Sequence, residues 1–314
     1  MKRIFSLAFF CLLHLCFLAN LAALTQSGQL NYAFIPENPR PGEPITLAVG
    51  CTDTVLHASL MIGERRLARS EFFRVPAKNG NRGFMAAILT VPSTARPGQA
   101  FVRIEGPYGT KSDIFFTIAY RSFRSEVIYL NPALTGIITD ASPQRRIEID
   151  QLWAIFNRTG TEIFATEAFI LPVNSTRRTS IFGSRRVFRH ADGQSNTSIH
   201  AGVDFGVPTG TPVHASAPGR VVLARSRIVT GKSVIIEHLP GVYSIYYHLD
   251  RIDVSEGLIV EAGAVLGLSG ATGLATGPHL HWEVRVSGEN TDPDALVARP
   301  LLDIEKILSK IVVD

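Results

Sequence analysis

Five residues in the C-terminal part of the chain have the types and spacing expected for metal-assisted hydrolysis. His200 and Asp204 lie in HAGVD, His248 ends IYYH, and His279 and His281 lie in GPHLHWEV. Imidazole nitrogens and carboxylate oxygens are the ligands of catalytic zinc, where about three protein ligands leave a fourth position for water. Zinc lowers the pKa of that water toward about 7, which makes hydroxide available at neutral pH. The five residues therefore predict a zinc-dependent hydrolytic site.

The elements around these residues decide which side chains can meet. GPHLHWEVRV is rich in strand-forming residues, and residues two apart on a strand share a face, so His279 and His281 face one site together. Trp282 then points to the opposite face, where we expect it to pack in the core. His200 and Asp204 stand four apart in a glycine-containing segment that leads into FGVPTGTPV. A loop entering a strand there can bring both side chains around one ion.

Each segment alone has a simpler interpretation. A single histidine on a strand is more often a packed or exposed residue than a ligand, and His238 in VIIEH is interpreted as structural. The tripeptide GKS at Gly231 lacks the glycine of a phosphate-binding loop, because Ser226 stands five residues earlier. The sequence has no HExxH, the motif of helix-borne zinc proteases. The prediction of a zinc site therefore depends on the combination of segments.

Together and in this order, the segments resemble the signatures of M23 peptidases, the lysostaphin and LytM type of peptidoglycan endopeptidase. The intervening GTPVHASAPGRVV, GKSVIIEH, GLIVEAGAVLGLSGATGLATG and DPDAL resemble the family too, so the likeness extends over approximately residues 182–296. Carried over by position, it implies that His200, Asp204 and His281 are the zinc ligands. It implies that His248 and His279 are the unligated pair beside the metal-bound water. One of these two histidines takes the proton of the water, and the other stabilises the oxyanion or protonates the leaving amine. Which histidine has which role stays open.

The resemblance implies a secreted zinc-dependent endopeptidase that hydrolyses peptide bonds in peptidoglycan cross-links or stem peptides during cell-wall remodelling. The alternative is a catalytically silent LytM-type regulator that binds and activates a cell-wall amidase. Regulators of that kind have lost metal ligands, whereas all five motif residues are present here. Peptidoglycan is the expected partner. A mixed case is autoinhibition, in which the N-terminal domain or the connector covers the site.

The first residues predict export from the cytoplasm. Lys2 and Arg3 precede an apolar run over residues 4–18, and small residues follow up to Ala23, which is the order of segments in a secretory signal peptide. We therefore predict a signal peptide over residues 1–23. A membrane anchor is the alternative, because the apolar stretch approaches the roughly 20 residues that span a bilayer. The expected location is extracytoplasmic, in the periplasm or cell envelope.

Cysteine usage argues against an internal disulfide. Cys11 and Cys16 lie in the predicted leader, so only Cys51 remains after cleavage. Cys51 ends the apolar segment ITLAVGC, where we expect a small buried hydrophobic residue. Folding then depends on ordinary hydrophobic cores.

The formal net charge of +4 is modest. Because the charge is low and basic residues are not interleaved with aromatic ones, nucleic acid is not an expected partner. Arginines do gather upstream of the first predicted ligand. Attraction to an anionic cell-wall substrate and a solvated face are both open interpretations. The cluster consists of Arg177, Arg178, Arg185, Arg186 and Arg189.

The pattern along the chain predicts a mainly β protein. Over residues 28–120, short apolar segments alternate with turns rich in proline and glycine, which predicts an immunoglobulin-like β-sandwich. Its predicted strands contain ITLAV, HASLMI, FFRVP, FMAAILTV, FVRIE and DIFFTIA. Residues 171–300 are expected to form a LytM-type antiparallel β-sheet domain, and residues 301–314 a C-terminal helix.

Residues 121–170 are expected to form a short connector with one helix. Ser142 can cap this helix and Pro143 can open it. An apolar stripe then follows at helical spacing and must be buried, which predicts a docked helix rather than a free tether. The stripe consists of Ile149, Leu152, Trp153 and Phe156.

Overall fold

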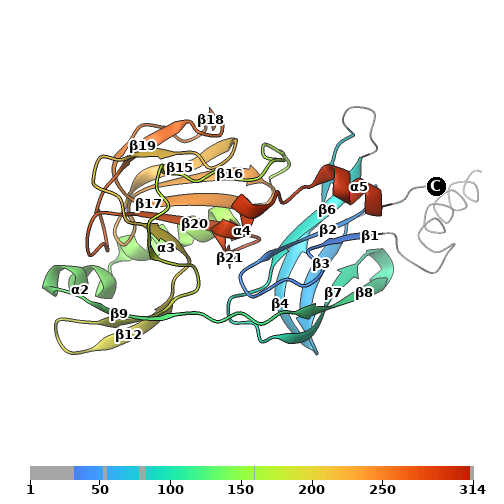
Figure 1. Ribbon diagram of the computed structural model, residues 1–314, viewed down its shortest axis with the longest axis horizontal. Helices are drawn as coiled ribbons and strands as arrows, with labels where there is room; N and C mark the ends of the chain where they lie inside the picture. The colour runs from blue at the N-terminus through green and yellow to red at the C-terminus, as the bar shows by residue number, and fades with distance from the viewer. Residues whose placement is uncertain (1–31, 52–54, 78–82, 159, 312–314) are drawn as a thin grey trace, which may run out of the picture.

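The computed structural model of the chain describes residues 32–51, 55–77, 83–158 and 160–311 (Figure 1). The predicted leader, residues 1–23, lies outside the described residues. Among the helices of these described ranges, none is long and apolar enough to cross a membrane. The architecture is mainly β, with N-terminal sheets, short helices and a large antiparallel sheet that is followed by helices, as the sequence predicts in outline.

The N-terminal region contains two four-stranded antiparallel sheets, ordered β1-β2-β6-β5 and β4-β3-β7-β8. Alternate side chains of β2, including Ile45 and Leu47, point into a core shared by the two sheets. The structure adds β1 and β4 to the strands expected from the sequence. The bounds are β1 (Tyr32–Ile35), β2 (Pro44–Gly50), β3 (His57–Ile62), β4 (Arg65–Glu71), β5 (Phe73–Val75), β6 (Phe84–Thr90), β7 (Gly98–Glu105) and β8 (Lys111–Ile118).

Strand β6 is buried on both faces, which explains its uninterrupted apolar sequence FMAAIL. Met85 and Leu89 belong to the core between the two N-terminal sheets, whereas Phe84 and Ile88 belong to the core that continues into the C-terminal region. The Thr90 and Thr291 hydroxyls also lie 2.5 Å apart across this contact. The N-terminal sheets are therefore packed firmly onto the rest of the protein.

The C-terminal region is built on an antiparallel sheet with the main order β10-β13-β20-β17-β16-β15-β18, extended by β14, β19 and β21. Trp282 is fully buried on the face opposite His281, as predicted. The bounds are β10 (Arg178–Ser180), β13 (Gly202–Phe205), β14 (Pro212–His214), β15 (Gly219–Arg227), β16 (Gly231–Leu239), β17 (Val242–Ile252), β18 (Ile259–Val260), β19 (Val265–Ser269), β20 (Leu280–Val286) and β21 (Glu289–Thr291).

The connector is more structured than expected. Strand β9 (Ser125–Tyr129) pairs in parallel with β11 (Arg185–Arg189), which also pairs with β12 (Ser195–Ile199). Figure 1 shows this small sheet beneath the large one. Helix α2 (Pro132–Thr139), which the sequence analysis missed, follows β9.

Helix α3 (Pro143–Phe156) begins where predicted, because the Ser142 side chain accepts a hydrogen bond from the Arg145 amide and Pro143 opens the helix. The prediction that its whole apolar stripe is buried is wrong. Phe156 is 5% exposed and packs in a small core with Tyr243, but Ile149 and Trp153 remain 44% and 47% exposed. The helix docks through its C-terminal turn and through buried Glu148, which accepts from the Ile228 amide.

Two further expectations differ from the structure. Cys51 is exposed rather than buried, because strand β2 ends at Gly50 and Cys51 follows it outside the sheet. The last helix is shorter than expected: α5 (Ile304–Lys310) begins only after Asp303, whose side chain caps it, and a separate α4 (Pro293–Ala298) precedes it. Leu301 is still buried, in the segment between these helices.

His238 is a structural residue, as interpreted from the sequence. Its ring is fully buried, with Nδ1 2.7 Å from the Pro218 carbonyl and Nε2 2.7 Å from the Ser244 hydroxyl. Burial lowers its pKa from the ordinary 6.5 to about 4. The folded protein therefore holds a neutral imidazole at pH values where the unfolded chain already binds a proton.

This difference predicts acid destabilisation. The stabilisation from neutral His238 is complete above about pH 6.5 and is lost as the pH falls toward about 4, because only the unfolded state is protonated in that range. The variant His238→Gln cannot titrate and should lose less stability over the same range, by on the order of 2 kcal/mol. Urea unfolding of both proteins between pH 7 and pH 4.5 measures the effect. Parallel stability curves would contradict it.

Candidate metal centre

Pairing between β13 and β20 brings three of the predicted residues together. The antiparallel register places Asp204 directly opposite His281, and His200 lies in the short connection between β12 and β13. The two strands approach so closely that a Cβ atom on Gly202 would lie 2.2 Å from the Trp282 carbonyl oxygen. The glycine in HAGVD is therefore required for this approach.

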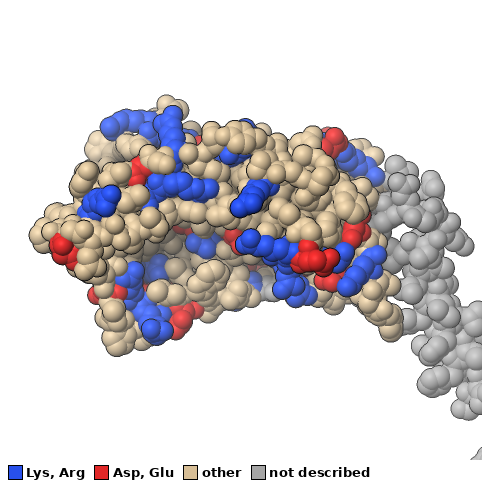
Figure 2. All heavy atoms as spheres, turned by 90° about the horizontal axis from the view of Figure 1, so that it is seen from below, with Lys and Arg blue, Asp and Glu red and all other residues tan. Residues whose placement is uncertain are grey.

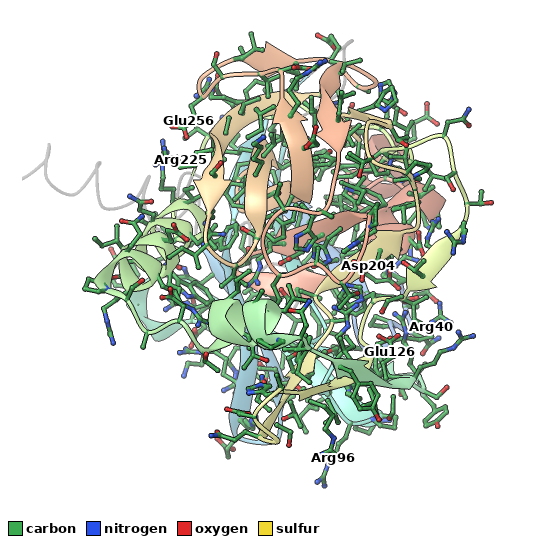
Figure 3. The ribbon with its side chains drawn as sticks, turned by 90° about the vertical axis from the view of Figure 1, so that its left-hand side faces the viewer. Arg40, Arg96, Glu126, Asp204, Arg225 and Glu256 are labelled. Atoms are coloured by element: carbon green, nitrogen blue, oxygen red, sulfur yellow. The ribbon has the colours of Figure 1, made fainter. Side chains whose placement is uncertain are left out.

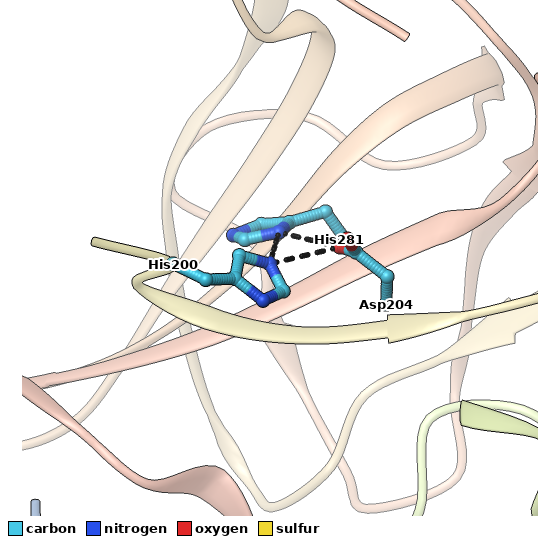
Figure 4. A group of neighbouring side chains, drawn as sticks. All are labelled: His200, Asp204 and His281. Carbon is cyan, nitrogen blue, oxygen red and sulfur yellow. Dashed lines mark hydrogen bonds and ion pairs between the residues drawn. The ribbon is translucent and has the colours of Figure 1, made fainter. Parts of the chain in front are cut away.

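Three donor atoms form a small triangle (Figure 4). Nε2 of His200 lies 3.1 Å from Oδ1 of Asp204 and 3.0 Å from Nδ1 of His281, and that Nδ1 lies 2.9 Å from the same Asp204 oxygen. Ligand atoms around a tetrahedral zinc ion, each about 2.0–2.1 Å from the metal, lie roughly 3.3 Å apart. The donor set and its spacing therefore fit one small divalent cation with little movement.

Neighbouring groups orient both imidazoles. Nδ1 of His200 donates to the Ile181 carbonyl (2.9 Å), so Nε2 carries the free lone pair. Nε2 of His281 donates to the Glu283 carboxylate (3.3 Å), so here Nδ1 carries the lone pair. Fixing the ring tautomer through the second nitrogen is how proteins usually prepare histidine ligands for a metal. When both rings are neutral, both lone pairs point into the triangle.

The surroundings of the triangle favour positive charge within it. Burial lowers the pKa of His281, but hydrogen bonds to Asp204 and Glu283 and their charges outweigh burial and raise that pKa to about 9. Burial opposes ionisation of Asp204, yet the adjacent His200 and His281 rings hold its pKa well below its usual range. A pocket that stabilises a cationic imidazole beside a carboxylate is also suited to a metal cation.

His248 lies beside the triangle in an unusual backbone conformation. Its φ of +62° is in the left-handed region, which costs a residue other than glycine on the order of 1–3 kcal/mol. The residue sits where β17 changes partners, since Tyr247 pairs with His281 on β20 and Leu249 pairs with Ser269 on β19. The change of partner turns the imidazole toward the site.

The second histidine beside the triangle is His279. Its ring centroid lies 4.8 Å from that of His248, and its Nε2 lies 3.8 Å from Oδ1 of Asp204. In both rings Nδ1 donates to a backbone carbonyl oxygen at 2.8 Å. The acceptor is the Thr272 carbonyl for His248 and the Gly277 carbonyl for His279. Each ring therefore presents an Nε2 lone pair that can take a proton. Burial and the nearby imidazoles lower the pKa of His248 to about 3, so it is neutral at physiological pH.

Two residues support the triangle that were not predicted to do so from the sequence. Arg186 donates to the second oxygen of Asp204 (2.6 Å), which leaves Oδ1 for an ion. The Tyr247 ring stacks on His281 at 5.4 Å between centroids. Tyr247 stands beside His248 in YYHL, which could have marked it, but the contact of Arg186 has no local sequence signal.

Three of the five clustered arginines are held by contacts within the protein, whereas Arg177 and Arg189 are exposed. Arg186 is paired inside the site, Arg185 donates to the Ser93 carbonyl (2.7 Å), and Arg178 pairs with Asp294 (2.9 Å). On the face shown in Figure 2, basic side chains are interspersed with acidic ones rather than forming one continuous field. Arg178, Arg185 and Arg186 therefore have structural contacts, and the two interpretations of the cluster apply to its exposed members.

Comparison with known proteins agrees with the geometry. The sequence profile of Peptidase family M23 matches residues 198–293, which include all five histidine and aspartate residues of the site. The crystal structure of a peptidase M23 from Pseudomonas aeruginosa superposes with a TM-score of 0.60 at 25% identity, covering 82% of this chain and 94% of that one. Residues 198–293 form an M23 peptidase domain.

Curated relatives of the M23 domain carry related names. The DD-carboxypeptidase/endopeptidase Mpg of Neisseria meningitidis is 39% identical over 124 residues, which is 40% of this chain and 28% of the relative. The peptidoglycan DD-endopeptidase ShyB of Vibrio cholerae is 43% identical over 110 residues, or 35% of this chain and 25% of the relative. The matched segment spans only about a quarter of the length of these relatives.

The geometry of the M23 domain makes metal binding testable. Cobalt(II) added to metal-free protein should give the visible absorption of a tetrahedral ion at one equivalent per chain. His281→Ala and Asp204→Ala each remove one corner of the triangle and should weaken binding by at least 100-fold.

Titration followed by absorbance measures both quantities, with His57→Ala in the N-terminal β3 as the control that should bind normally. Unchanged cobalt affinity in the His281 and Asp204 variants would rule out the triangle as the site.

Proposed function

We propose that this chain is a zinc-dependent endopeptidase that hydrolyses peptide bonds in peptidoglycan cross-links or stem peptides. The observation that carries the proposal is the triangle of His200, Asp204 and His281 with two proton-accepting imidazoles beside it. The names of the relatives support the substrate, because they include peptidoglycan DD-endopeptidases.

Zinc is the metal that the donor set favours. Two imidazoles and one carboxylate oxygen, with a fourth position open, form a ligand set found in catalytic zinc sites. When bound, zinc polarises a carbonyl group and makes hydroxide available at neutral pH. The triangle supplies the three ligands, and His248 and His279 remain outside it.

His248 and His279 supply the proton transfers in this proposal. Each is fixed by a hydrogen bond from Nδ1 to a backbone carbonyl, so that Nε2 can accept a proton from the attacking water or hold one for the leaving amine. A protonated or donating imidazole at the same position also stabilises the oxyanion. The lowered pKa keeps His248 unprotonated but also makes its imidazole a weaker base, so the proposal assigns neither histidine to a single role.

The proposed substrate sets the location. Peptidoglycan lies outside the cytoplasmic membrane, so we infer that the protein acts in the periplasm or cell envelope, in agreement with the predicted leader over residues 1–23. Peptidoglycan is also the proposed partner. The silent-regulator alternative is less favoured, because the metal triangle and both flanking histidines are present and mutually oriented.

In our proposal, residues 28–120 form an immunoglobulin-like β-sandwich, residues 121–170 the connector, residues 171–300 the LytM-type domain and residues 301–314 its terminal segment. The packing favours a fixed scaffold over a removable cover. The Ser287 hydroxyl donates to the carbonyl of Ile88 in the N-terminal region (3.0 Å). Ser287 lies six residues beyond His281, which corresponds to about 20 Å along the strand direction. This N-terminal contact is therefore distant from the proposed reaction centre.

The proposal predicts release of soluble muropeptides from purified cell-wall sacculi by zinc-loaded protein. His248→Ala and His279→Ala should each lower the rate by about 10²–10⁴-fold while zinc stays bound, because they remove proton transfer and not a ligand. Mass analysis of the products identifies the bond that is cut, and metal analysis checks the zinc content.

His57→Ala serves as the control and should retain full activity. Zinc-loaded wild-type protein that releases no muropeptides but stimulates a cell-wall amidase would support the regulator instead.

A further inference from the structure

A carboxylate of the connector lies at the meeting point of two hydrogen-bond chains that lead to the metal triangle. Glu126 is on β9, outside the segment matched by the family profile. The Ser180 hydroxyl donates to its carboxylate at 2.9 and 2.8 Å, and Arg186 donates to it from Nε at 3.3 Å. Figure 3 shows Glu126 close below Asp204.

The first chain ends at His200. Because the Ser180 hydroxyl donates its hydrogen to Glu126, its oxygen is left to accept from Nδ1 of His200, 3.1 Å away. The Ile181 carbonyl accepts from the same Nδ1. A proton held on Nδ1 keeps the Nε2 lone pair aimed at the triangle.

The second chain ends at Asp204. Arg186 donates from Nη2 to Oδ2 of Asp204 while its Nε donates to Glu126. Its side chain is only 15% exposed, so its charge must be balanced by these two carboxylates. With Glu126 removed, Asp204 would face the full arginine charge, and its Oδ1 would attract a cation less strongly.

Strand register places the parts of this network. Parallel pairing sets Glu126 of β9 beside Arg186 of β11, and antiparallel pairing sets Ser180 of β10 beside Asp204 of β13. The network therefore joins four strands, and backbone hydrogen bonds hold the two strands of each pair together.

We propose that Glu126 is a positioning residue for the metal centre, which orients His200 through Ser180 and preserves the charge of Asp204 through Arg186. The proposal builds on the proposed zinc site. It makes the connector a part of that site and not a spacer.

The test is zinc affinity of the full-length metal-free protein, measured by competition with a chromogenic chelator. Glu126→Gln keeps the side-chain shape and removes the charge, and it should weaken zinc binding about 10–100-fold, the range found when groups behind metal ligands are removed. Ser180→Ala cuts only the branch to His200 and should give a smaller loss. Thermal unfolding of the metal-free proteins should be nearly unchanged by both substitutions.

Glu256→Gln is the matched control. Glu256 also accepts from an arginine (Arg225, 2.9 Å) and from a backbone amide (Ala224, 3.1 Å), but it lies away from the site in Figure 3, so zinc affinity should be unchanged. Wild-type zinc affinity in well-folded Glu126→Gln and Ser180→Ala proteins would overturn the positioning role. So would a lower unfolding temperature of both metal-free variants with no loss of affinity, because that result marks a merely structural role. Failure of the wild type to bind zinc would instead remove the proposed function.

Discussion

The antiparallel pairing of β13 with β20 is the constraint on which the site depends. It sets Asp204 opposite His281 on the same face of the sheet, and Gly202 permits the close approach of the two backbones. A shift of one residue would turn one of these side chains to the other face, where Trp282 and Val203 pack in the core. Core packing and site geometry therefore enforce the same register.

The cost of burying charge explains why so many charged groups surround the triangle. An isolated buried carboxylate is strongly destabilising unless it is paired and hydrogen-bonded. Asp204 is paired with Arg186, and Glu283 behind His281 is paired with Arg285 at 2.7 Å. Each of these carboxylates therefore has an arginine partner: Arg285 pairs with Glu283, and Arg186 is shared between Asp204 and Glu126. The arrangement keeps the centre attractive to a cation without leaving an uncompensated charge around it.

The site residues that could be predicted from the sequence are those that lie in short motifs. HAGVD, YYH and HLH place their residues by strand period and short spacing, and the structure brings all five side chains together. The groups behind them carry no such signal: Glu126 and Arg186 are 60 residues apart in sequence and meet only through a parallel strand pair. In the fold, turn sequences indicated most N-terminal strands, and Ser142 with Pro143 marked the start of α3. The exposure of Ile149 and Trp153 could not be predicted from the helical spacing of apolar residues. That spacing shows which residues share one face of the helix, but it does not show whether another element packs against that face.

The connector and the N-terminal sheets belong to one structural unit with the site. The even-numbered residues of β6, such as Phe84 and Ile88, share a core with Val203 and Trp282, whose strands hold Asp204 and His281. The connector adds contacts on two other sides: Glu126 accepts from Ser180 and Arg186, and Glu148 of α3 accepts from the Ile228 amide (2.9 Å). That amide lies near Thr230, whose carbonyl accepts from the His248 amide (3.0 Å) and helps to hold its left-handed backbone. The connector thus supports the site from outside the segment that carries the motifs, through Glu126 at Arg186 and Glu148 at Ile228.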